Sequence, residues 1–283
     1  MRNTLKLAAA LLLLTQASVM AEGLLDQVKA GGAVRVGFAE QEPFISTGPN
    51  GQLTGYEVDL LSAVISKIGP SKLEAVPTQF GALIPGLQAK RFDVVASDLY
   101  IRPDRCKIIA FAEPTHIVND GLIVLAGNPK NIHSYADIVK DPTIKVGYIA
   151  GGGPIADHAI AAGVSKDQLS TLPDFNSLLA AVKTKRIDAF LNTGISISSV
   201  LKAANDTSVE RAEPFEQAVI DGKPANATGS YAFRTEDQPF VDEFNKHLAM
   251  IVASGEAVKI GEKYGFAASD IPDGKVKTAD LCK

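Results

Sequence analysis

The sequence predicts an α/β protein built as two lobes, and three patterns in its 283 residues support this. Residues 33–96 alternate short apolar runs with helical segments in the order β-α-β-α-β, which is typical of a mostly parallel sheet with helices on both faces. The same alternation restarts near residue 135 and continues to residue 204. Two further apolar runs, at residues 121–126 and 230–233, are candidate strands crossing between the halves.

The expected lobes do not follow the chain order. One lobe is expected to hold residues 22–122 and 231–283. The second, residues 123–230, is inserted between the crossing strands. A ligand would lie in the cleft between lobes that close by a hinge.

Each element is predicted from its hydrophobic period and the residues that end it. The clearest helix covers residues 56–68, where apolar side chains fall on one face and Gly69-Pro70 ends it. The other expected helices cover residues 24–30, 80–90, 135–139, 154–162, 175–183, 196–204, 240–254 and 257–264. The remaining expected strands cover residues 33–38, 73–77, 92–96, 144–149, 169–172 and 187–191.

The first residues are typical of an export signal. Arg2 and Lys6 form a positive n-region, an apolar run follows, and Ala21 is a small residue suited to signal peptidase. Residues 1–21 are therefore expected to be removed. The apolar run is too short for a stable membrane anchor. We expect an exported, soluble protein, which in a bacterium means the periplasm.

Composition narrows the possible partners. The chain is 46% hydrophobic and 21% charged, with a net charge of −4. Without the signal, 26 basic side chains face 32 acidic ones, which gives −6. No basic patch is present, so nucleic acid is not an expected partner.

The two cysteines, Cys106 and Cys282, have two interpretations. An even count in an exported protein favours a disulfide, which would hold the C-terminus beside Arg105. The alternative is two unrelated thiols. The two cysteines and four scattered histidines show no zinc-ligand spacing, and no metal site is expected.

Residues 92–111 form the stretch around which the site is expected. A buried strand breaks at Ser97-Asp98, and Pro103 then begins a helix. Small ligands bind where strands run into helices at the carboxyl edge of such a sheet. Arg105 would lie at the mouth of the crevice, where its guanidinium matches a carboxylate in two parallel hydrogen bonds. A surface ion pair is the alternative for this arginine.

Other first-lobe loops are expected to converge on Arg105. An aromatic box attracts a delocalised cation through its ring faces, at roughly 0.5–2 kcal/mol per contact. An arginine beside such a box describes a site for a small zwitterion. The alternative is that the phenylalanines belong to the core. The expected first-lobe residues are Gln41, Phe44, Phe80, Asp98, Tyr100 and Arg105.

The second lobe is expected to contribute a glycine-rich turn and a strand end. Gly152 and Gly153 precede Pro154 at a helix start, where free N–H groups favour an anion. The run lacks the pattern of a nucleotide-binding loop, so no cofactor is expected. Asn192 and Thr193 end the next strand and can hydrogen-bond a polar ligand edge.

No nucleophile motif is present, and the chain is not expected to be an enzyme. Glu40, Glu42 and Asp98 are the only carboxylates that suggest acid–base work, and the sequence does not place them.

Four segments together resemble the bacterial extracellular solute-binding proteins of family 3, which serve polar amino acid ABC transporters. They are VRVGF at residues 34–38, GQLTGYEVDLLSAV at 51–64, FGALIPGLQAKRFDVVAS at 80–97 and IRPDRCKIIAFAEP at 101–114. The resemblance implies the type II periplasmic binding protein fold, a monomer that delivers its ligand to an inner-membrane permease. It also implies that Arg105 clamps the ligand carboxylate.

Departures from the family pattern bear on the ligand. Amino acid binders of the family carry an aspartate for the α-ammonium near the position of Thr193. Phe44, Phe80, Tyr100 and Arg105 instead resemble the ectoine and hydroxyectoine binders, although Gln41 stands where those binders carry an acid. Asp98 is a candidate for the missing charge.

Three other interpretations stay open at this point. One is a binder of a polar amino acid or an opine. Another is a lyase resembling periplasmic cyclohexadienyl dehydratase, with Glu42 or Asp98 as general acid. The third is a sensor whose closed form is recognised by a receptor.

Overall fold

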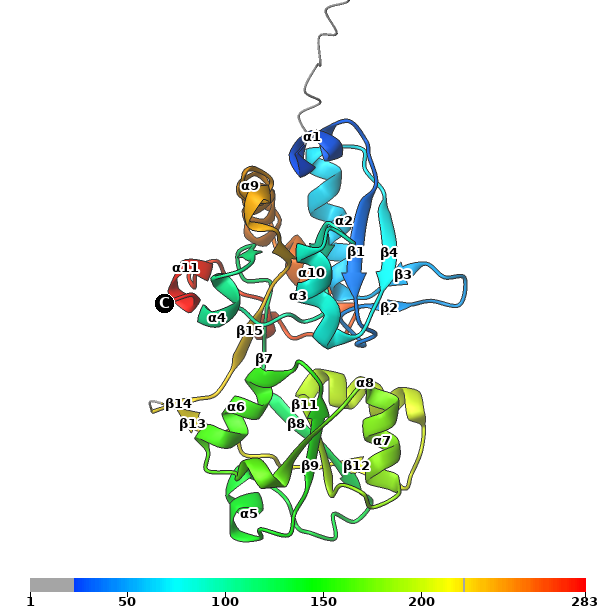
Figure 1. Cartoon of the computed structure of the whole chain (residues 1–283), viewed down its shortest axis with the longest axis vertical. Helices are drawn as coiled ribbons and strands as arrows, with labels where there is room; N and C mark the ends of the chain where they lie inside the picture. Colours follow the sequence, from blue (N-terminus) through cyan, green and yellow to red (C-terminus); the bar gives the residue numbers. More distant parts are fainter. Residues whose placement is uncertain (1–22, 221) are drawn as a thin grey trace, which may run out of the picture.

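The computed structural model describes residues 23–220 and 222–283, which form two lobes with one five-stranded sheet each (Figure 1). The expected two-lobed α/β fold is confirmed. The signal peptide expected over residues 1–21 lies outside the described residues. Within the described ranges, no helix is long and apolar enough to cross a membrane.

The first lobe is built on a sheet with the strand order β4-β1-β5-β16-β6. Strand β1 pairs in parallel with both β4 and β5, so the loops after β1 and β5 leave the same edge side by side. This places the chain after Phe38 next to the chain after Val95. The strands are β1 (Val34–Phe38), β4 (Leu73–Pro77), β5 (Val94–Val95), β6 (Ala110–Phe111) and β16 (Ala232–Phe233).

Helices from both ends of the chain cover this sheet. The predicted helix at residues 56–68 is present with those bounds as α2 (Tyr56–Ile68), and it packs against α9. Phe233 of the sheet and Phe240 and Phe244 of α9 form a fully buried aromatic cluster, and burial of each ring contributes about 1.5–3 kcal/mol. The other helices are α1 (Leu24–Lys29), α3 (Leu83–Gln88), α4 (Pro103–Cys106), α9 (Gln238–Ala253), α10 (Glu256–Glu262), α11 (Thr278–Leu281), and the short 3₁₀ turns η1 (Phe80–Ala82), η3 (Thr235–Asp237) and η4 (Ala268–Asp270).

The helix expected over residues 80–90 is divided in the structure. Phe80–Ala82 form η1, and α3 begins only at Leu83. Pro85 lies in the first turn of α3, where its missing N–H removes no helical hydrogen bond. The division leaves Phe80 ahead of the helix, facing the other lobe.

The second lobe has a sheet with the order β10-β9-β11-β8-β12, in which β8 is antiparallel to its neighbours. Its strands are β8 (Asp120–Leu125), β9 (Val146–Ile149), β10 (Leu169–Leu172), β11 (Ala189–Thr193) and β12 (Val209–Arg211). Its helices are α5 (Tyr135–Lys140), α6 (Gly153–Ala161), α7 (Phe175–Lys183), α8 (Gly194–Ala204) and the turn η2 (Lys166–Gln168).

Two paired strands, β7 (His116–Val118) and β15 (Ala227–Gly229), connect the lobes (Figure 1). The predicted crossings at residues 121–126 and 230–233 are wrong. The first of these segments is β8, inside the second sheet, and the second contains β16, inside the first. The period of a short apolar run does not reveal which sheet it joins. The proposed boundary after residue 122 therefore cuts through β8. Two small hairpins complete the fold, β2 (Ser46–Thr47) with β3 (Leu53–Thr54) and β13 (Val219–Ile220) with β14 (Lys223–Pro224).

The predicted disulfide between Cys106 and Cys282 is confirmed. It joins α4, which carries Arg105, to the C-terminal helix α11 across 176 residues of sequence. The C-terminal segment is thereby fixed beside the residue expected to bind the ligand carboxylate.

Candidate functional site

A small pocket lies between the lobes, and seven of the ten predicted ligand-binding residues line it. The first lobe contributes Gln41, Phe80, Asp98, Tyr100 and Arg105, and the second contributes Ile149, Gly152, Ile155 and Asn192. The pocket holds only about 20 Å³, roughly the space of one water molecule, so a larger ligand enters when the lobes move apart. Ile149 and Ile155 were not predicted, and their only signal in the sequence is their position on either side of the glycine-rich turn.

Asp98 is the carboxylate of this pocket. Its backbone is left-handed, with φ 49°, and its side chain is buried. Gln41 Nε2 donates to one carboxylate oxygen at 2.6 Å, and His116 Nε2 lies 2.8 Å from the other. Burial raises the pKa of Asp98, while these partners favour its charged form. Each oxygen keeps a lone pair for a ligand cation.

A second buried carboxylate, that of Glu57, holds the backbone of Asp98 in place. Glu57, on α2, accepts the backbone N–H of Asp98 through Oε2 at 3.0 Å, while its Oε1 has no hydrogen-bond partner among the residues that the structure describes. Burial raises the pKa of Glu57 to about 7. His116, on the connecting strand β7, is also fully buried. Glu57 and His116 were not predicted, because each reaches Asp98 through a tertiary contact.

Glu57 makes stability depend on pH, and replacing it by glutamine should remove that dependence. A pKa raised from 4.5 to about 7 contributes stability that is full below about pH 4.5 and is lost as the pH rises through about 7. The contribution amounts to roughly 3 kcal/mol. Urea unfolding at pH 5 and pH 8 of the native protein and of Glu57→Gln measures it, because the other titrations cancel in the comparison. Equal pH dependence in the two proteins would contradict the assignment.

Arg105 is the cationic side chain among the described residues that line this pocket. Its Nη1 donates to the carbonyl of Tyr100 at 3.0 Å, and its Nη2 donates to the carbonyl of Gly151, in the other lobe, at 3.1 Å. Burial lowers its pKa to about 10, and the guanidinium stays charged at neutral pH. Asp98 and Arg105 thus give the pocket one anionic and one cationic group.

The aromatic part of the site contains two rings rather than the expected three. Phe80 and Tyr100 line the pocket, and Phe44 does not. Residues 41–45 fold into a turn, in which the Phe44 N–H donates to the carbonyl of Gln41. This turn points the Phe44 ring into the core, where it is fully buried against His116 and Phe266. The structure therefore does not bring Phe44 to the pocket with the other two rings, and its contact with His116 makes it a support for Asp98.

The two residues at the end of β11 have different roles: Asn192 lines the ligand pocket, and Thr193 stabilises the fold. Asn192 lines the pocket; its Oδ1 accepts the N–H of Thr193 at 2.7 Å, so its amide donors stay available. Thr193 is buried and caps α8, where its hydroxyl accepts the Ser196 N–H. The structure therefore does not bring Thr193 to the pocket, because the residue is the N-cap of the following helix.

The glycine-rich turn has fewer free backbone N–H groups for binding an anion than its sequence suggests. Gly152 lines the pocket, but its N–H already donates to the carbonyl of Ile149 at 2.9 Å. Gly153 begins α6. No three His, Cys, Asp or Glu side chains of residues 23–220 and 222–283 are grouped as metal ligands.

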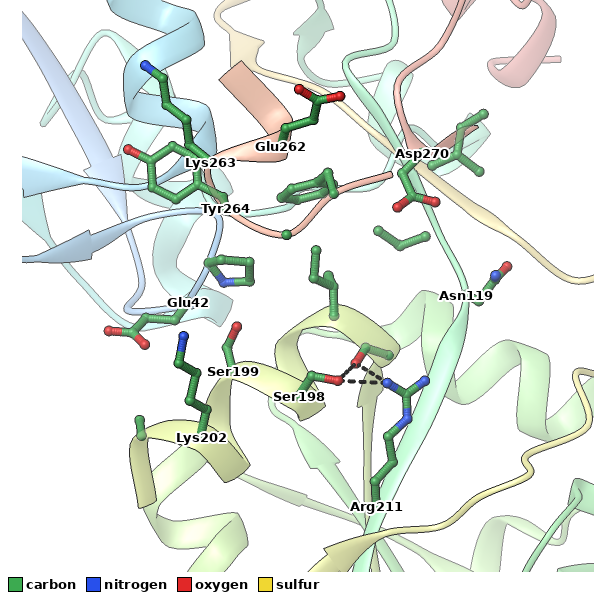
Figure 2. Close-up of a pocket in the computed structure, with 18 residues that line it drawn as sticks. Glu42, Asn119, Ser198, Ser199, Lys202, Arg211, Glu262, Lys263, Tyr264 and Asp270 are labelled. Atoms are coloured by element: carbon green, nitrogen blue, oxygen red, sulfur yellow. Dashed lines mark hydrogen bonds between the residues drawn. The ribbon is translucent and has the colours of Figure 1, made fainter. Parts of the chain in front are cut away.

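A second and larger hollow lies between the lobes and measures about 910 Å³ (Figure 2). Gly153 aside, none of the predicted ligand residues that the structure describes lines it. Lys202 and Ser198 of α8 form its floor, and Glu262, Lys263 and Tyr264 lie across from them. Glu42, the candidate acid of the lyase interpretation, lines this hollow and not the small pocket. Glu40 is engaged by Thr47 at the surface.

The fold and the site define a class of protein: two lobes with a small polar and aromatic pocket between them are typical of a solute-binding protein. The model of the bacterial extracellular solute-binding proteins, family 3, matches residues 34–267. The chain belongs to this family, as its sequence motifs implied.

Three individual proteins illustrate the similarity. The chain is 34% identical to a probable amino-acid ABC transporter periplasmic-binding protein of Sinorhizobium fredii, over 97% of this chain and 91% of that one. It is 26% identical to the L-cystine-binding protein TcyJ of Escherichia coli, over 86% of each chain. Among solved structures it is similar to EhuB in complex with hydroxyectoine, with a TM-score of 0.81, 32% identity, and coverage of 92% of this chain and 98% of that chain. Two of these relatives are named as binding proteins, and EhuB was solved with a bound ligand. The chain is a solute-binding protein of the same family.

Proposed function

We propose that this protein captures a compact zwitterion such as ectoine or hydroxyectoine for an ABC importer. The observation that carries the proposal is the pairing of Asp98 and Arg105 with Phe80 and Tyr100 in one buried pocket. The ligand carboxylate meets Arg105 in a charge-assisted, two-bonded contact. Its delocalised cation lies between the rings and faces Asp98.

Because the pocket is buried, its pair of opposite charges favours ligands that carry both charges over ligands that carry one. A ligand with only one charge leaves either Asp98 or Arg105 desolvated without a partner, which is costly in a low-dielectric pocket. Gln41 supplies no charge, but its amide holds Asp98 at 2.6 Å. Asp98 therefore takes the position of counter-charge that the resemblance assigns to an acid at residue 41.

The role is reversible capture without bond making. Closing the lobes desolvates the ligand, and the closed, monomeric complex is then presented to an inner-membrane permease in the periplasm. Recognition of the closed form by a receptor is the sensor version of the same chemistry.

Two alternatives have specific support. A polar amino acid is favoured by the names of the curated relatives, and the second lobe offers Asn192 for its ammonium. A lyase is suggested by the similarity to an ancestral amino acid-binding protein described as a precursor of cyclohexadienyl dehydratase, at 26% identity and a TM-score of 0.69. Glu42 lies outside the pocket, which leaves Asp98 as the candidate acid for that reaction.

Isothermal titration of the refolded, ligand-free protein separates these functions. Ectoine, hydroxyectoine, glycine betaine, L-cystine and the polar amino acids are titrated in parallel, and each is also incubated to detect turnover. We expect binding of about micromolar strength or tighter to the ectoines, with no product. Binding of amino acids alone would overturn the ligand assignment and keep the family. Turnover would establish the lyase.

Asp98→Asn should weaken ectoine binding about tenfold to a hundredfold, because a hydrogen bond to a charged group contributes about 1.5–3 kcal/mol. Asparagine keeps the shape and removes the charge. Asp26→Asn, an exposed change on α1, is the matched control and should bind as the native protein does. Unchanged affinity in Asp98→Asn would show that the cation lies elsewhere.

A further inference from the structure

Three contacts join the lobes beside the pocket, and Gly151 takes part in two of them. Its carbonyl accepts the Nη2 donor of Arg105 at 3.1 Å, and its Cα faces Gly81 of the first lobe. An ion pair between Arg102 and Asp157 lies in the same region. That pair is partly exposed, at 29% and 54%, and such pairs contribute little by themselves.

Only glycine fits at residue 151 in this arrangement. Its φ is 88°, a left-handed conformation that side chains disfavour. A Cβ there would lie 2.8 Å from the Cα and 3.0 Å from the nitrogen of Gly81, and 3.3 Å from Cδ1 of Phe80. Two of these atoms are backbone of the opposite lobe and cannot rotate away. The lobes would have to separate to make room.

The opposite side of the same contact is roomier. A Cβ built on Gly81 meets only Ala150, at 3.6 Å from its carbonyl oxygen, which is ordinary van der Waals contact. The Gly81–Gly151 contact is therefore asymmetric: one added methyl group obstructs it from residue 151 and not from residue 81.

We propose that Gly151 is a positioning residue that sets how far the lobes close. Its contact with Gly81 brings Gly152 and Ile149 against Phe80 and Arg105, so it determines the width of the ligand pocket. Gly151 does not itself line that pocket. It acts on the equilibrium between open and closed lobes, and it therefore governs affinity for all ligands rather than the choice among them. The inference rests on the proposed capture of a ligand between closing lobes.

Gly151→Ala should weaken ectoine binding about tenfold to a hundredfold, as expected for overpacking at a close contact. Two matched controls separate closure from other effects. Gly127→Ala carries the same backbone penalty, since Gly127 has φ 77° in the same lobe but nothing within 4 Å of its Cβ position. Gly81→Ala changes the same contact from its roomier side. Both controls should bind within about twofold of the native protein.

Lobe separation is the readout that distinguishes closure from a lost contact. Spin labels at Lys67→Cys and Lys140→Cys, exposed in the first and second lobes, report the inter-lobe distance, with the native cysteines held in their disulfide. In Gly151→Ala saturated with ectoine the distance should stay longer than in the native protein and in both controls. The ligand-free distribution should also lose its shortest distances. Equal distances in Gly151→Ala and the native protein would overturn the proposal.

Two further arms keep the test decisive. Gly81→Leu projects beyond Cβ toward Ala150 without a positive φ, so it should reproduce the defect even if Gly151→Ala fails to fold. If the native protein does not bind ectoine, the proposed ligand is wrong. The role of Gly151 in closure is then tested separately, by comparing the inter-lobe distances of Gly151→Ala and the native protein without ligand. The same comparison is made with whichever titrated compound binds.

Discussion

Arg105→Ala should weaken ectoine binding by about 2–5 kcal/mol, the cost of leaving a buried charge without its partner. Arg105 is the only cationic side chain that lines the small pocket within the described residues. Its donors now satisfy two carbonyls, and a ligand carboxylate entering between the lobes would compete for the same fork. Titration calorimetry at neutral pH, where the guanidinium is charged, measures the loss.

A graded series identifies the cause of that loss. Arg105→Lys keeps the charge but not the planar fork, so it should fall between the native protein and the alanine variant. Arg91→Ala, an exposed change in the same lobe, is the control and should leave affinity unchanged. If Arg105→Ala bound ectoine as tightly as Arg91→Ala, the carboxylate site would have to lie elsewhere.

Removing the disulfide should lower the free energy of unfolding by roughly 5 kcal/mol in the chain-entropy model, because it closes a loop of 176 residues. The double variant Cys106→Ser with Cys282→Ser avoids an unpaired thiol. Urea unfolding of both proteins gives the difference. The bridge also anchors α11 to α4, so Arg105 should lose order and ectoine affinity should fall in the double variant.

The control for this experiment is the native protein unfolded with and without reductant. Reduction should reproduce the stability loss of the double variant and leave that variant itself unaffected. A loss below about 1 kcal/mol would show that the bridge does not restrain the unfolded chain in the way the entropy model assumes.

Local patterns in the sequence predicted most of the architecture. Helix α2 begins and ends where its apolar face and Gly69-Pro70 indicated. Part of the candidate site follows from a sheet-edge argument: parallel pairing of β1 with β5 brings Gln41, Asp98 and Tyr100 together. These features depend on residues near one another in the chain, or on pairing rules that hold for most α/β sheets.

The features of the site that the sequence did not predict all depend on contacts between residues far apart in the chain. Nothing around Phe44 in sequence shows that Phe266 packs against it, and this contact holds the ring in the core. The buried support of Asp98 by Glu57 and His116 joins α2, β7 and the loop after β5. The Gly81–Gly151 contact exists only when the two lobes meet. Such contacts depend on tertiary structure, which a hydrophobic period does not encode.

The most direct test of the central claim is a crystal structure of the protein grown with ectoine. We predict that the ligand lies in the small pocket between Phe80 and Tyr100, with its carboxylate on both Nη atoms of Arg105 and its cation facing Asp98. Ectoine bound instead in the larger hollow beside Lys202 and Arg211 (Figure 2), or in the small pocket with its carboxylate turned away from Arg105, would contradict the account.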